Sequence, residues 1–506
     1  MTNIDYQNSF ILILLCLFPT FLFLFVYFFK KPKNVSNLPP SPPSLPFIGH
    51  LHHLFSAPIH KSFQKTSSKY GPILHLRIFN LPVILVSSAS VVYEIFKDHD
   101  MNASHGPVAI DECLVFGSSG FVKAPYGAYF KFMKKLITTN MLGPQALERS
   151  RGVRAAEVER FYIYLLDKAM KKKSIEIGEE AMRLVNSILG NMSMGRGFSE
   201  ENNNEAKVSK FALEFIGFTN KMLFAQIWRK PLEKLGISPF KKEIMDASYR
   251  FEELLERIIV KCEEKVDQHQ GTEIMKTLLA SYRGENTEYK VTRNHIKALL
   301  AELFFGAGHS SSTTMKWTMA ELMNNPKIFE RLREEIISVV GKTRLIQETD
   351  LPKLPYLKAI IKESLRLHPP GYLLPRELEQ GCKIRGFYIP KNTLLVINAY
   401  AVMRDPNSWK DPDEFKPERF LGQEEEKKVK ELKFLGFSAG RRACPGSNLG
   451  NIIVEIAIGV MVQCFDWEIE GENVNMEETS GRMFLAMAHP LKCTPLPRIL
   501  NLLPTL

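Results

Sequence analysis

A single cysteine, Cys444, lies in a stretch whose residue types suit metal binding. Residues 437–446 read FSAGRRACPG, which combines an aromatic residue, two glycines, two arginines and the cysteine. The apolar residues 449–465, LGNIIVEIAIGVMVQCF, follow and predict a helix. Backbone N–H groups at the start of a helix donate to a nearby sulfur and favour the thiolate, which is the form that binds a metal ion. The sequence therefore predicts a thiolate ligand at Cys444.

A second polar stretch, LFFGAGHSSSTT, occupies residues 303–314 and lies within the helical periodicity of residues 295–324. Its histidine, His309, is followed by five hydroxyl side chains, of which Ser310 is the first. Buried histidines and serines are more often parts of satisfied hydrogen-bond networks than of active sites. The stretch by itself therefore does not distinguish a structural histidine from a catalytic one.

Two further motifs precede the cysteine. KESLRLHPP contains Glu363 and Arg366 with the i, i+3 spacing of a helical ion pair, and FKPERF contains Arg419. A glutamate and an arginine three residues apart occur routinely on helix surfaces and mean little alone. Together with the spacing F-x-x-G-x-R-x-C-x-G, however, these motifs occur in the order found in cytochromes P450, and the chain resembles that family. The resemblance implies a mainly α protein with minor β-sheets, the cytochrome P450 fold, and a haem b cofactor.

The resemblance assigns roles within the cysteine loop. Cys444 would be the axial thiolate of the haem iron, a ligand that favours O–O cleavage. Arg442 would pair with a haem propionate, and Phe437 would pack against the macrocycle and shield the sulfur. Gly440 and Gly446 would allow a close approach of the backbone. The resemblance makes Glu363, Arg366 and Arg419 a buried ion-pair network that holds the fold.

Further propionate contacts are implied by position. Arg376, in LLPRE, matches the strand arginine of the family. In YGAYFKFMKK, Phe130 and Lys134 stand where the family usually has tryptophan and arginine, and His105 stands where an arginine is common. Phenylalanine donates no hydrogen bond, and lysine is a point charge and not a bidentate fork. We therefore expect the haem to be lost more easily than in relatives with tryptophan and arginine.

The resemblance also places the polar stretch over the haem. Aligned from Trp317, residues 306–311 fall on the plant motif (Ala/Gly)-Gly-x-(Asp/Glu)-Thr-(Thr/Ser). The small residues leave room for oxygen and weaken the helical hydrogen-bond ladder. Ser310 and His309, which replace the family's threonine and carboxylate, are the catalytic candidates. His309 is interpreted as a proton relay, as a structural residue beside water that carries the protons, or as the mark of impaired oxygen activation.

The composition describes a folded chain. The 506 residues are 45% hydrophobic and 24% charged, and no strong bias indicates disorder. The seven cysteines include no C-x-x-C pair, which argues against a disulfide framework or a zinc site and for a reducing compartment. The net charge of +11 suits an anionic membrane surface, an acidic partner, or a merely solvated surface. No nucleic-acid partner is predicted.

The N-terminal residues predict a membrane anchor. Residues 10–29 form an uncharged run long enough to cross a bilayer, although a cleaved signal peptide is the alternative interpretation. Lysines follow the run, so residues 1–9 are expected in the lumen and the remainder in the cytosol. Residues 30–46 form a basic, proline-rich hinge, and residues 47–506 form the haem-thiolate catalytic domain. Strands are expected early, in ILHLRIF and PVILVSS, and late, in LLVINAYAV.

The wider sequence resembles the plant microsomal A-type members, in particular a crucifer subgroup that oxidises triterpenes such as thalianol and arabidiol. The function implied is an NADPH- and O2-dependent monooxygenase of the endoplasmic reticulum membrane that oxidises a small hydrophobic secondary metabolite, with electrons from NADPH-cytochrome P450 reductase. The alternatives are phenylpropanoid or flavonoid oxidation, a reductase-independent hydroperoxide isomerase or dehydratase, and a haem protein with impaired oxygen activation. Substrate contacts are expected, besides the distal helix, from residues 110–121, 211–224, 371–374 and 483–486.

Overall fold

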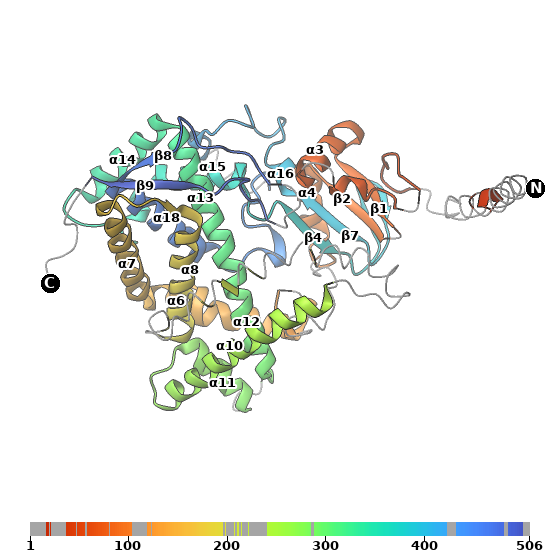
Figure 1. The fold of residues 1–506 in the computed structure, drawn as a ribbon. Helices are drawn as coiled ribbons and strands as arrows, with labels where there is room; N and C mark the ends of the chain where they lie inside the picture. The colour runs from red at the N-terminus through yellow and green to blue at the C-terminus, as the bar shows by residue number, and fades with distance from the viewer. Residues whose placement is uncertain are drawn as a thin grey trace, which may run out of the picture.

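The computed structural model describes most of the chain beyond the N-terminal run. The described residues are 17–19, 21, 37–46, 48–55, 58–79, 81–103, 119–122, 124–195, 198, 207, 210–211, 214, 221, 240–284, 288–422, 432–479 and 484–498. Figure 1 shows a body of long helices and, at one end of it, a small sheet with short helices. The predicted class, mainly α with minor sheets, is confirmed.

The small sheet joins segments from both ends of the sequence. Its four strands lie in the order β1-β2-β7-β4, with β2 parallel to β7 and the other pairs antiparallel. The runs ILHLRIF and PVILVSS supply β1 and β2, and these predictions are confirmed. In LLVINAYAV the first five residues form β7 as predicted, whereas the last four, Ala399–Val402, form helix α16. The strands are β1 Ile73–Ile78, β2 Leu81–Val86, β4 Leu373–Glu377 and β7 Leu394–Asn398.

Alternating side chains explain why this sheet is buried on both faces. In β2, Ile84 faces one hydrophobic cluster and Leu85 faces another, and both side chains are fully buried. A strand covered on both faces reads as a continuous apolar run, as β2 does. Figure 1 shows short helices beside the sheet: α3 Ile59–Tyr70, α4 Ala89–Asp98 and α16 Ala399–Val402. Helix α2, His52–Phe55, precedes α3 and packs against it.

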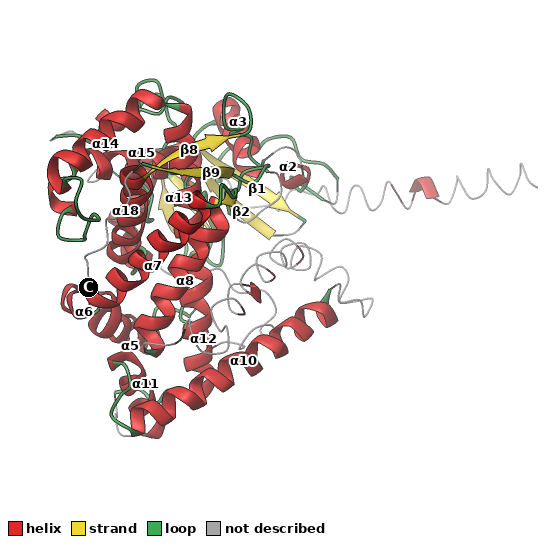
Figure 2. Cartoon of the chain, turned by 60° about the vertical axis from the view of Figure 1, so that its left-hand side comes forward, coloured by secondary structure: helices red, strands yellow, loops and turns green. Residues whose placement is uncertain are grey.

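The helical body surrounds α18, which is the apolar helix that follows the cysteine loop. Helix α13 packs between α8 and α18 in one large hydrophobic cluster, and Figure 2 shows these helices side by side with the long helix α10 along the lower edge. The long helices are α7 Arg151–Met170, α8 Ile177–Met194, α10 Lys241–Asp267, α13 His309–Asn324, α14 Pro326–Val340, α15 Pro355–Leu367 and α18 Ser447–Cys464.

Shorter elements complete the described chain. A three-stranded sheet has the order β3-β9-β8, and β5 pairs with β6. These elements are α5 Ala128–Ile137, η2 Thr138–Leu142, α6 Pro144–Arg149, β3 Ile175–Glu176, α11 Glu273–Arg283, α12 Arg293–Leu303, η4 Phe304–Gly308, η5 Leu351–Lys353, β5 Cys382–Ile384, β6 Phe387–Ile389, η6 Pro417–Phe420, η7 Gly440–Arg442, β8 Phe465–Ile469 and β9 Lys492–Pro497.

The distal helix is interrupted where the sequence has its small residues. The expected helix of residues 295–324 is present as α12 and α13, and the π-helical segment η4 separates them. A π turn widens the hydrogen-bond ladder by one residue and is found frequently at functional sites. The predicted local opening of the ladder is therefore confirmed.

The membrane anchor prediction falls mostly outside the described residues. Within residues 10–29, residues 17–19 and 21 are described, and all four are helical and exposed. Among the described residues, only α18 has the length and hydropathy of a membrane span. Most of α18 is buried inside the protein, however, which is typical of a core helix.

Candidate functional site

Cys444 lies just before α18, between the short helix η7 and the first turn of the long helix. Its N–H donates to the carbonyl of Phe437 at 3.0 Å, which closes the loop. Desolvation by surrounding atoms raises the pKa of the thiol, and the N–H of Gly446, which donates to the sulfur, opposes that increase. The proton on the sulfur must therefore leave when a metal binds, which makes metal affinity dependent on pH.

The two loop glycines differ in what they allow. Gly440 has a φ of +70°, and a Cβ there would overlap the carboxylate of Asp100. That carboxylate accepts the N–H of Arg441 at 3.1 Å, so the close approach fixes the loop. Gly446 has a φ of −92°, and a Cβ there would make only an ordinary contact, 3.9 Å from the Cys444 sulfur. Protein contacts therefore require glycine at position 440, whereas those at position 446 do not.

Arg442 lies across the ring of Phe130, with 4.1 Å between the guanidinium carbon and the ring centroid. Its two terminal nitrogens donate to the carbonyls of Val122, at 3.1 Å, and of Ala124. Phe130 in turn stacks on Phe121 with the centroids 4.8 Å apart. The phenylalanine that stands in the usual tryptophan position thus supports the arginine of the cysteine loop.

Arg376 approaches the same loop from strand β4. Its Nη2 donates to the Ser438 hydroxyl at 2.8 Å and its Nη1 to the carbonyl of Pro375 at 2.8 Å. Its Nε is buried and has no hydrogen-bond acceptor in the described part of the chain. Burial, with a further contribution from the charge of Arg442, lowers the pKa of Arg376 to about 10. Two guanidiniums that repel each other in a desolvated site favour an anionic ligand.

Lys134 reaches the cysteine loop by another contact. Its ammonium donates to the carbonyl of Arg441 at 3.0 Å, which ties α5 to η7. His105, which stands where an arginine is common in the family, lies outside the described residues. The structure thus brings Lys134, Phe130 and Arg376 into contact with residues of the loop that carries Cys444.

These residues fit a haem with two propionates. The site combines a sulfur donor at a helix start, a pair of guanidiniums of which one has an unsatisfied buried N–H, and aromatic side chains at Phe437 and Phe130. An apolar macrocycle suits the aromatic groups, and its carboxylates suit the guanidiniums.

On the distal helix, Ser310 donates its hydroxyl to the carbonyl of Gly306 at 2.6 Å. Thr314 repeats the pattern one turn later and donates to the carbonyl of Ser310 at 2.9 Å. Such bonds to the preceding turn bend and soften a helix. His309 packs its ring against Phe484, with the centroids 4.7 Å apart. The Ser310 hydroxyl retains its capacity to accept a hydrogen bond while its proton points to Gly306.

Gly308 allows helix α8 to approach the π-helical segment. A Cβ at this position would lie 2.6 Å from Oδ1 of Asn186, whose side chain is fully buried. Cβ atoms essentially never lie so close to another heavy atom. The small residue therefore serves the packing of α8 against the distal helix, in addition to the groove expected for oxygen.

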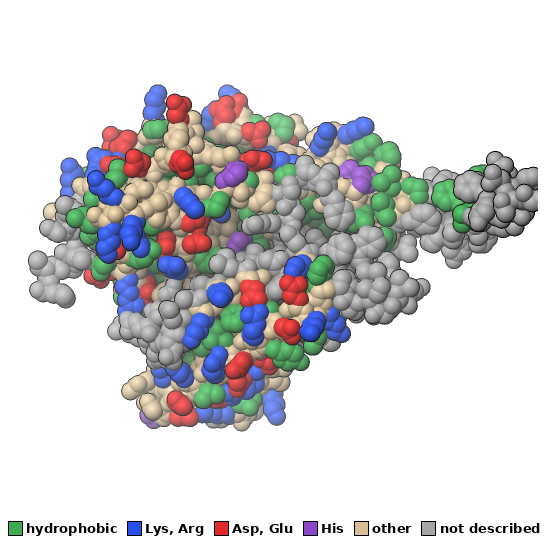
Figure 3. Space-filling view, in the orientation of Figure 1, with side chains coloured by type: hydrophobic (Ala, Val, Ile, Leu, Met, Phe, Trp, Pro, Cys, Tyr) green, Lys and Arg blue, Asp and Glu red, His purple; other side chains and the backbone are tan. Residues whose placement is uncertain are grey.

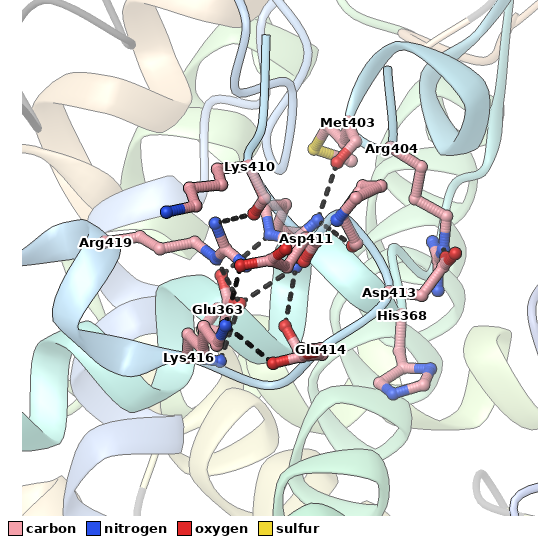
Figure 4. A network of polar contacts seen from close by, with 12 residues as sticks. Glu363, His368, Met403, Arg404, Lys410, Asp411, Asp413, Glu414, Lys416 and Arg419 are labelled. Atoms are coloured by element: carbon pink, nitrogen blue, oxygen red, sulfur yellow. Dashed lines mark hydrogen bonds and ion pairs between the residues drawn. The ribbon is translucent and has the colours of Figure 1, made fainter. Parts of the chain in front are cut away.

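The three predicted network residues meet in the interior. Glu363 and Arg366 are fully buried and form a bidentate pair at 2.7 and 2.8 Å. Arg419 donates to the same carboxylate at 3.2 Å, and the Lys416 N–H donates to it at 2.9 Å. Figure 4 shows Glu363 at the centre of these contacts, with Arg419 and Lys416 around it.

The second half of the network binds backbone. Arg366 donates to the carbonyls of Met403, at 2.9 Å, and Pro412, at 2.7 Å, and Arg419 donates to that of Asp411 at 2.5 Å. The network therefore joins α15 and η6 to the segment of residues 403–414 (Figure 4).

Sequence reasoning missed two residues that position the site. Glu302 accepts the N–H groups of Phe121 and Val122, both at 3.0 Å, and so holds the segment whose carbonyl receives Arg442. An isolated carboxylate in the apolar run ALLAELFFGAG was the available signal. Ser438, with a φ of +60°, presents its hydroxyl to Arg376, and nothing in its residue type indicated this role.

The expected substrate contacts are described in part. Phe121, Leu373, Leu374 and the 484–486 segment are placed, whereas most of residues 110–121 and 211–224, together with Met483, lie outside the described residues. Leu485 binds back to the residue 371–374 region, because its N–H donates to the carbonyl of Pro370 at 3.1 Å.

Comparison with known proteins identifies full-length relatives. Residues 39–495 match the family model described as Cytochrome P450. Cytochrome P450 705A1 and Cytochrome P450 705A22 of Arabidopsis thaliana are each 61% identical, and the alignments cover 98% of this chain and 97% and 98% of theirs. The 3,9-dihydroxypterocarpan 6A-monooxygenase of Glycine max is 36% identical, over 98% of this chain and 99% of its own.

A solved structure of a zebra fish cytochrome P450 with abiraterone has the same fold. Its TM-score is 0.73 at 22% identity, and the match covers 88% of this chain and all of that one. The predicted cytochrome P450 fold and the resemblance to the crucifer subgroup are confirmed.

Proposed function

The chain belongs to the cytochrome P450 family, whose members are haem-thiolate monooxygenases, and from that premise we propose that it oxidises a triterpenoid at the endoplasmic reticulum membrane. The observation that carries the haem-thiolate part of the proposal is the cysteine loop, in which Cys444 follows Arg442 by two residues and the charge of Arg442 acts on the buried Arg376. Haem b, when bound to Cys444, supplies the iron at which dioxygen is activated.

The chain's own residues orient that cofactor. Arg442 and Arg376 would hold the propionates, and Phe437 and Phe130 would supply apolar surface. Gly440 keeps the loop closed against Asp100, and the N–H of Gly446 stabilises the thiolate. Lys134 adds a positive charge to the loop backbone. The buried network of Glu363, Arg366 and Arg419 is assigned a structural role.

Protons reach the distal side through the helix that carries Ser310 and His309. The Ser310 hydroxyl donates to the Gly306 carbonyl, so it would accept a hydrogen bond on the distal side, and it would donate one there if its bond to Gly306 opened. His309 passes the proton on, because imidazole exchanges protons near neutral pH. A structural His309 beside ordered water, and a haem protein with impaired oxygen activation, are the competing interpretations.

Electrons come from NADPH through NADPH-cytochrome P450 reductase. Lys131, Lys135 and Arg441 are exposed, and Lys134 links α5 to the cysteine loop. We assign these four cations to the face that receives the reductase. Opposite charge on the reductase would speed encounter at this face. An ordinary solvated role for the same residues predicts no salt dependence of electron transfer.

The membrane assignment follows the chain from its N-terminus. We assign residues 1–9 to the lumen, residues 10–29 to the anchor, residues 30–46 to the hinge, and residues 47–506 to the catalytic domain. Figure 3 shows apolar side chains over the end where β1 and β2 lie, and the exposed ones there include Leu45 and Leu81. Exposed apolar groups at one end suit contact with a bilayer.

The substrate class rests on the crucifer subgroup that the chain resembles. A specific observation also favours the second candidate, a polycyclic phenolic compound, because one relative is named for its action on 3,9-dihydroxypterocarpan. A third possibility, hydroperoxide isomerisation or dehydration without a reductase, would not need the Ser310 and His309 relay.

The test is co-expression with a plant reductase and a panel of triterpene scaffolds, phenylpropanoids, flavonoids and a dihydroxypterocarpan. Mass spectrometry should detect addition of one oxygen to a triterpene only when NADPH is supplied. Oxidation of the phenolic compounds alone would replace the substrate class, and turnover of a lipid hydroperoxide without NADPH would replace the reaction. Cys444→Ser should abolish the thiolate signature in the carbon monoxide difference spectrum, and its survival would overturn the axial assignment.

A further inference from the structure

Glu478 is a buried carboxylate that joins the two ends of the sequence. Its side chain is 4% exposed, and its Oε2 lies 2.8 Å from Nε2 of His60 and 2.8 Å from Nζ of Lys61, both on α3. His60 and Glu478 are 418 residues apart in the chain. A buried carboxylate that loses its partners costs several kcal/mol, so these contacts strongly restrain the position of Glu478.

The charge states of the cluster can be assigned. Burial alone would raise the pKa of Glu478, but the hydrogen bonds from His60 and Lys61 outweigh it and lower that pKa to about 2. Burial lowers the pKa of His60, which is therefore neutral at neutral pH and donates its Nε2–H to the carboxylate. Lys61, at 46% side-chain exposure, and the buried Arg404 supply the compensating positive charge.

His60 is itself held in place. Its ring packs against Tyr372 and Tyr400, with centroid distances of 4.6 and 4.3 Å, and its carbonyl accepts the side-chain amide of Asn398 at 2.9 Å. The partner that receives Glu478 is therefore a rigid part of the sheet end, not a mobile surface group.

Glu478 begins a short antiparallel pair that ends next to the distal helix. Glu478 pairs with Met487, and the Thr479 N–H donates to the Ala486 carbonyl at 2.9 Å. Phe484, on the returning side of this pair, contacts the ring of His309. Only a few residues thus separate the anchored carboxylate from the aromatic ring beside the candidate relay.

We propose that Glu478, held by His60 and Lys61, is a positioning residue that places Phe484 against His309 and so sets the free space on the distal side. The inference rests on the proposed haem site, because the distal side is the side of that haem which faces Ser310 and His309. It does not depend on the substrate class or on the reductase.

Two iron ligands of different size test the proposal on the haem-loaded enzyme. Imidazole and 4-phenylimidazole are titrated by difference spectroscopy, and the ratio of their Kd values measures distal space. Phe484→Ala should lower the Kd of 4-phenylimidazole relative to that of imidazole by about threefold or more. Glu478→Gln and Lys61→Met should change the ratio in the same direction. Hydrogen exchange of the Thr479 and Leu485 amides should accelerate in these two variants.

Matched variants separate positioning from general damage. Lys61→Arg keeps the charge and should keep the ratio of the unsubstituted enzyme. Glu477→Gln alters the neighbouring carboxylate, which is 69% exposed and lies 3.8 Å from His489, and should also leave the ratio unchanged. Lys61→Met keeps the test valid if Glu478→Gln does not fold. A changed ratio in Phe484→Ala with an unchanged ratio in Lys61→Met would overturn the proposal, and so would an unchanged ratio in Phe484→Ala.

Discussion

Contacts that cannot be read from the local sequence orient individual side chains at the candidate haem site. Ser310 directs its hydroxyl to Gly306, and Arg442 lies across Phe130 while binding two carbonyls. Contacts with the protein thus fix the orientation of both side chains. Such preorganisation lowers the cost of orienting groups during a reaction.

The role of His309 is tested by His309→Asp, which introduces the carboxylate that relatives commonly carry. If His309 relays protons, we expect the fraction of NADPH lost as hydrogen peroxide to change by about twofold or more, because delivery of protons decides between productive turnover and uncoupling. Peroxide and NADPH are measured together in a reductase-coupled assay. An unchanged fraction would favour the structural interpretation.

Glu363 should be more important for stability than an exposed carboxylate in the same network. Glu363→Gln leaves Arg366 with an uncompensated buried charge, and we expect unfolding to become easier by about 3–5 kcal/mol, with loss of bound haem. Glu414→Gln, at 63% side-chain exposure, is the control and should change stability little. Denaturant unfolding of the two variants, followed by haem absorbance, makes the comparison. Equal effects would contradict the assigned structural role.

At the scale of elements, the π-helical segment is where helix α8, the distal helix and the relay candidates meet. Its glycines differ in environment, since Gly308 faces Asn186 whereas Gly306 has no atom within 4 Å of an added Cβ. A helix of uniform α geometry would not create this local widening.

These two glycines form a matched pair for stability measurements. Gly308→Ala should destabilise the protein by about 1–3 kcal/mol, because the methyl group collides with the side-chain oxygen of Asn186. Gly306→Ala should be neutral or stabilising by about 0.5–1 kcal/mol, as alanine favours the helix. Thermal unfolding of both variants checks this, and an equal loss in both would rule out the contact with Asn186.

Helix α18 carries a buried acid that should make stability depend on pH. Burial raises the pKa of Glu455 to about 7, against the lowering influence of Lys358 and Lys362. A raised carboxyl pKa means that the folded state binds the proton more tightly, so its stabilisation is complete below pH 4.5 and is lost as pH rises to about 7. The total effect is at most about 3 kcal/mol.

Glu455→Gln should therefore flatten the dependence of the unfolding temperature on pH between pH 5 and about 8, and it should stabilise the protein most at the upper end. Glu468→Gln, which alters an exposed acid on β8, is the control. A slope that stays the same in Glu455→Gln would show that another group titrates in this range.

At the scale of the molecule, the sheet end and the helical body are joined by contacts between residues far apart in the sequence. The pairing of β2 with β7 and the approach of Arg376 to Ser438 bring early and late segments together beside the cysteine loop. The exposed Leu45 and Leu81 lie at the sheet end. The proposed membrane attachment belongs to this scale, because it sets how the whole body is oriented.

Deletion of residues 1–30 tests the attachment. We expect the full chain to resist extraction from membranes with alkaline carbonate, and the shortened chain to be released, because a run of about 20 apolar residues provides the main insertion energy. Both forms should retain the carbon monoxide difference spectrum. Release of the full chain by carbonate would contradict a spanning anchor.

The sequence alone was sufficient for the mainly helical class, the three strand runs, the cysteine motif and the family. These follow from local periodicity and from a spacing that few other proteins share. The tertiary structure decided what depends on distant partners: that Phe130 supports Arg442, that Asn186 limits position 308, that Glu302 holds the segment at Val122, and that Glu478 meets His60. No local pattern encodes such contacts, because chain topology determines which segments meet and close packing determines how their side chains touch.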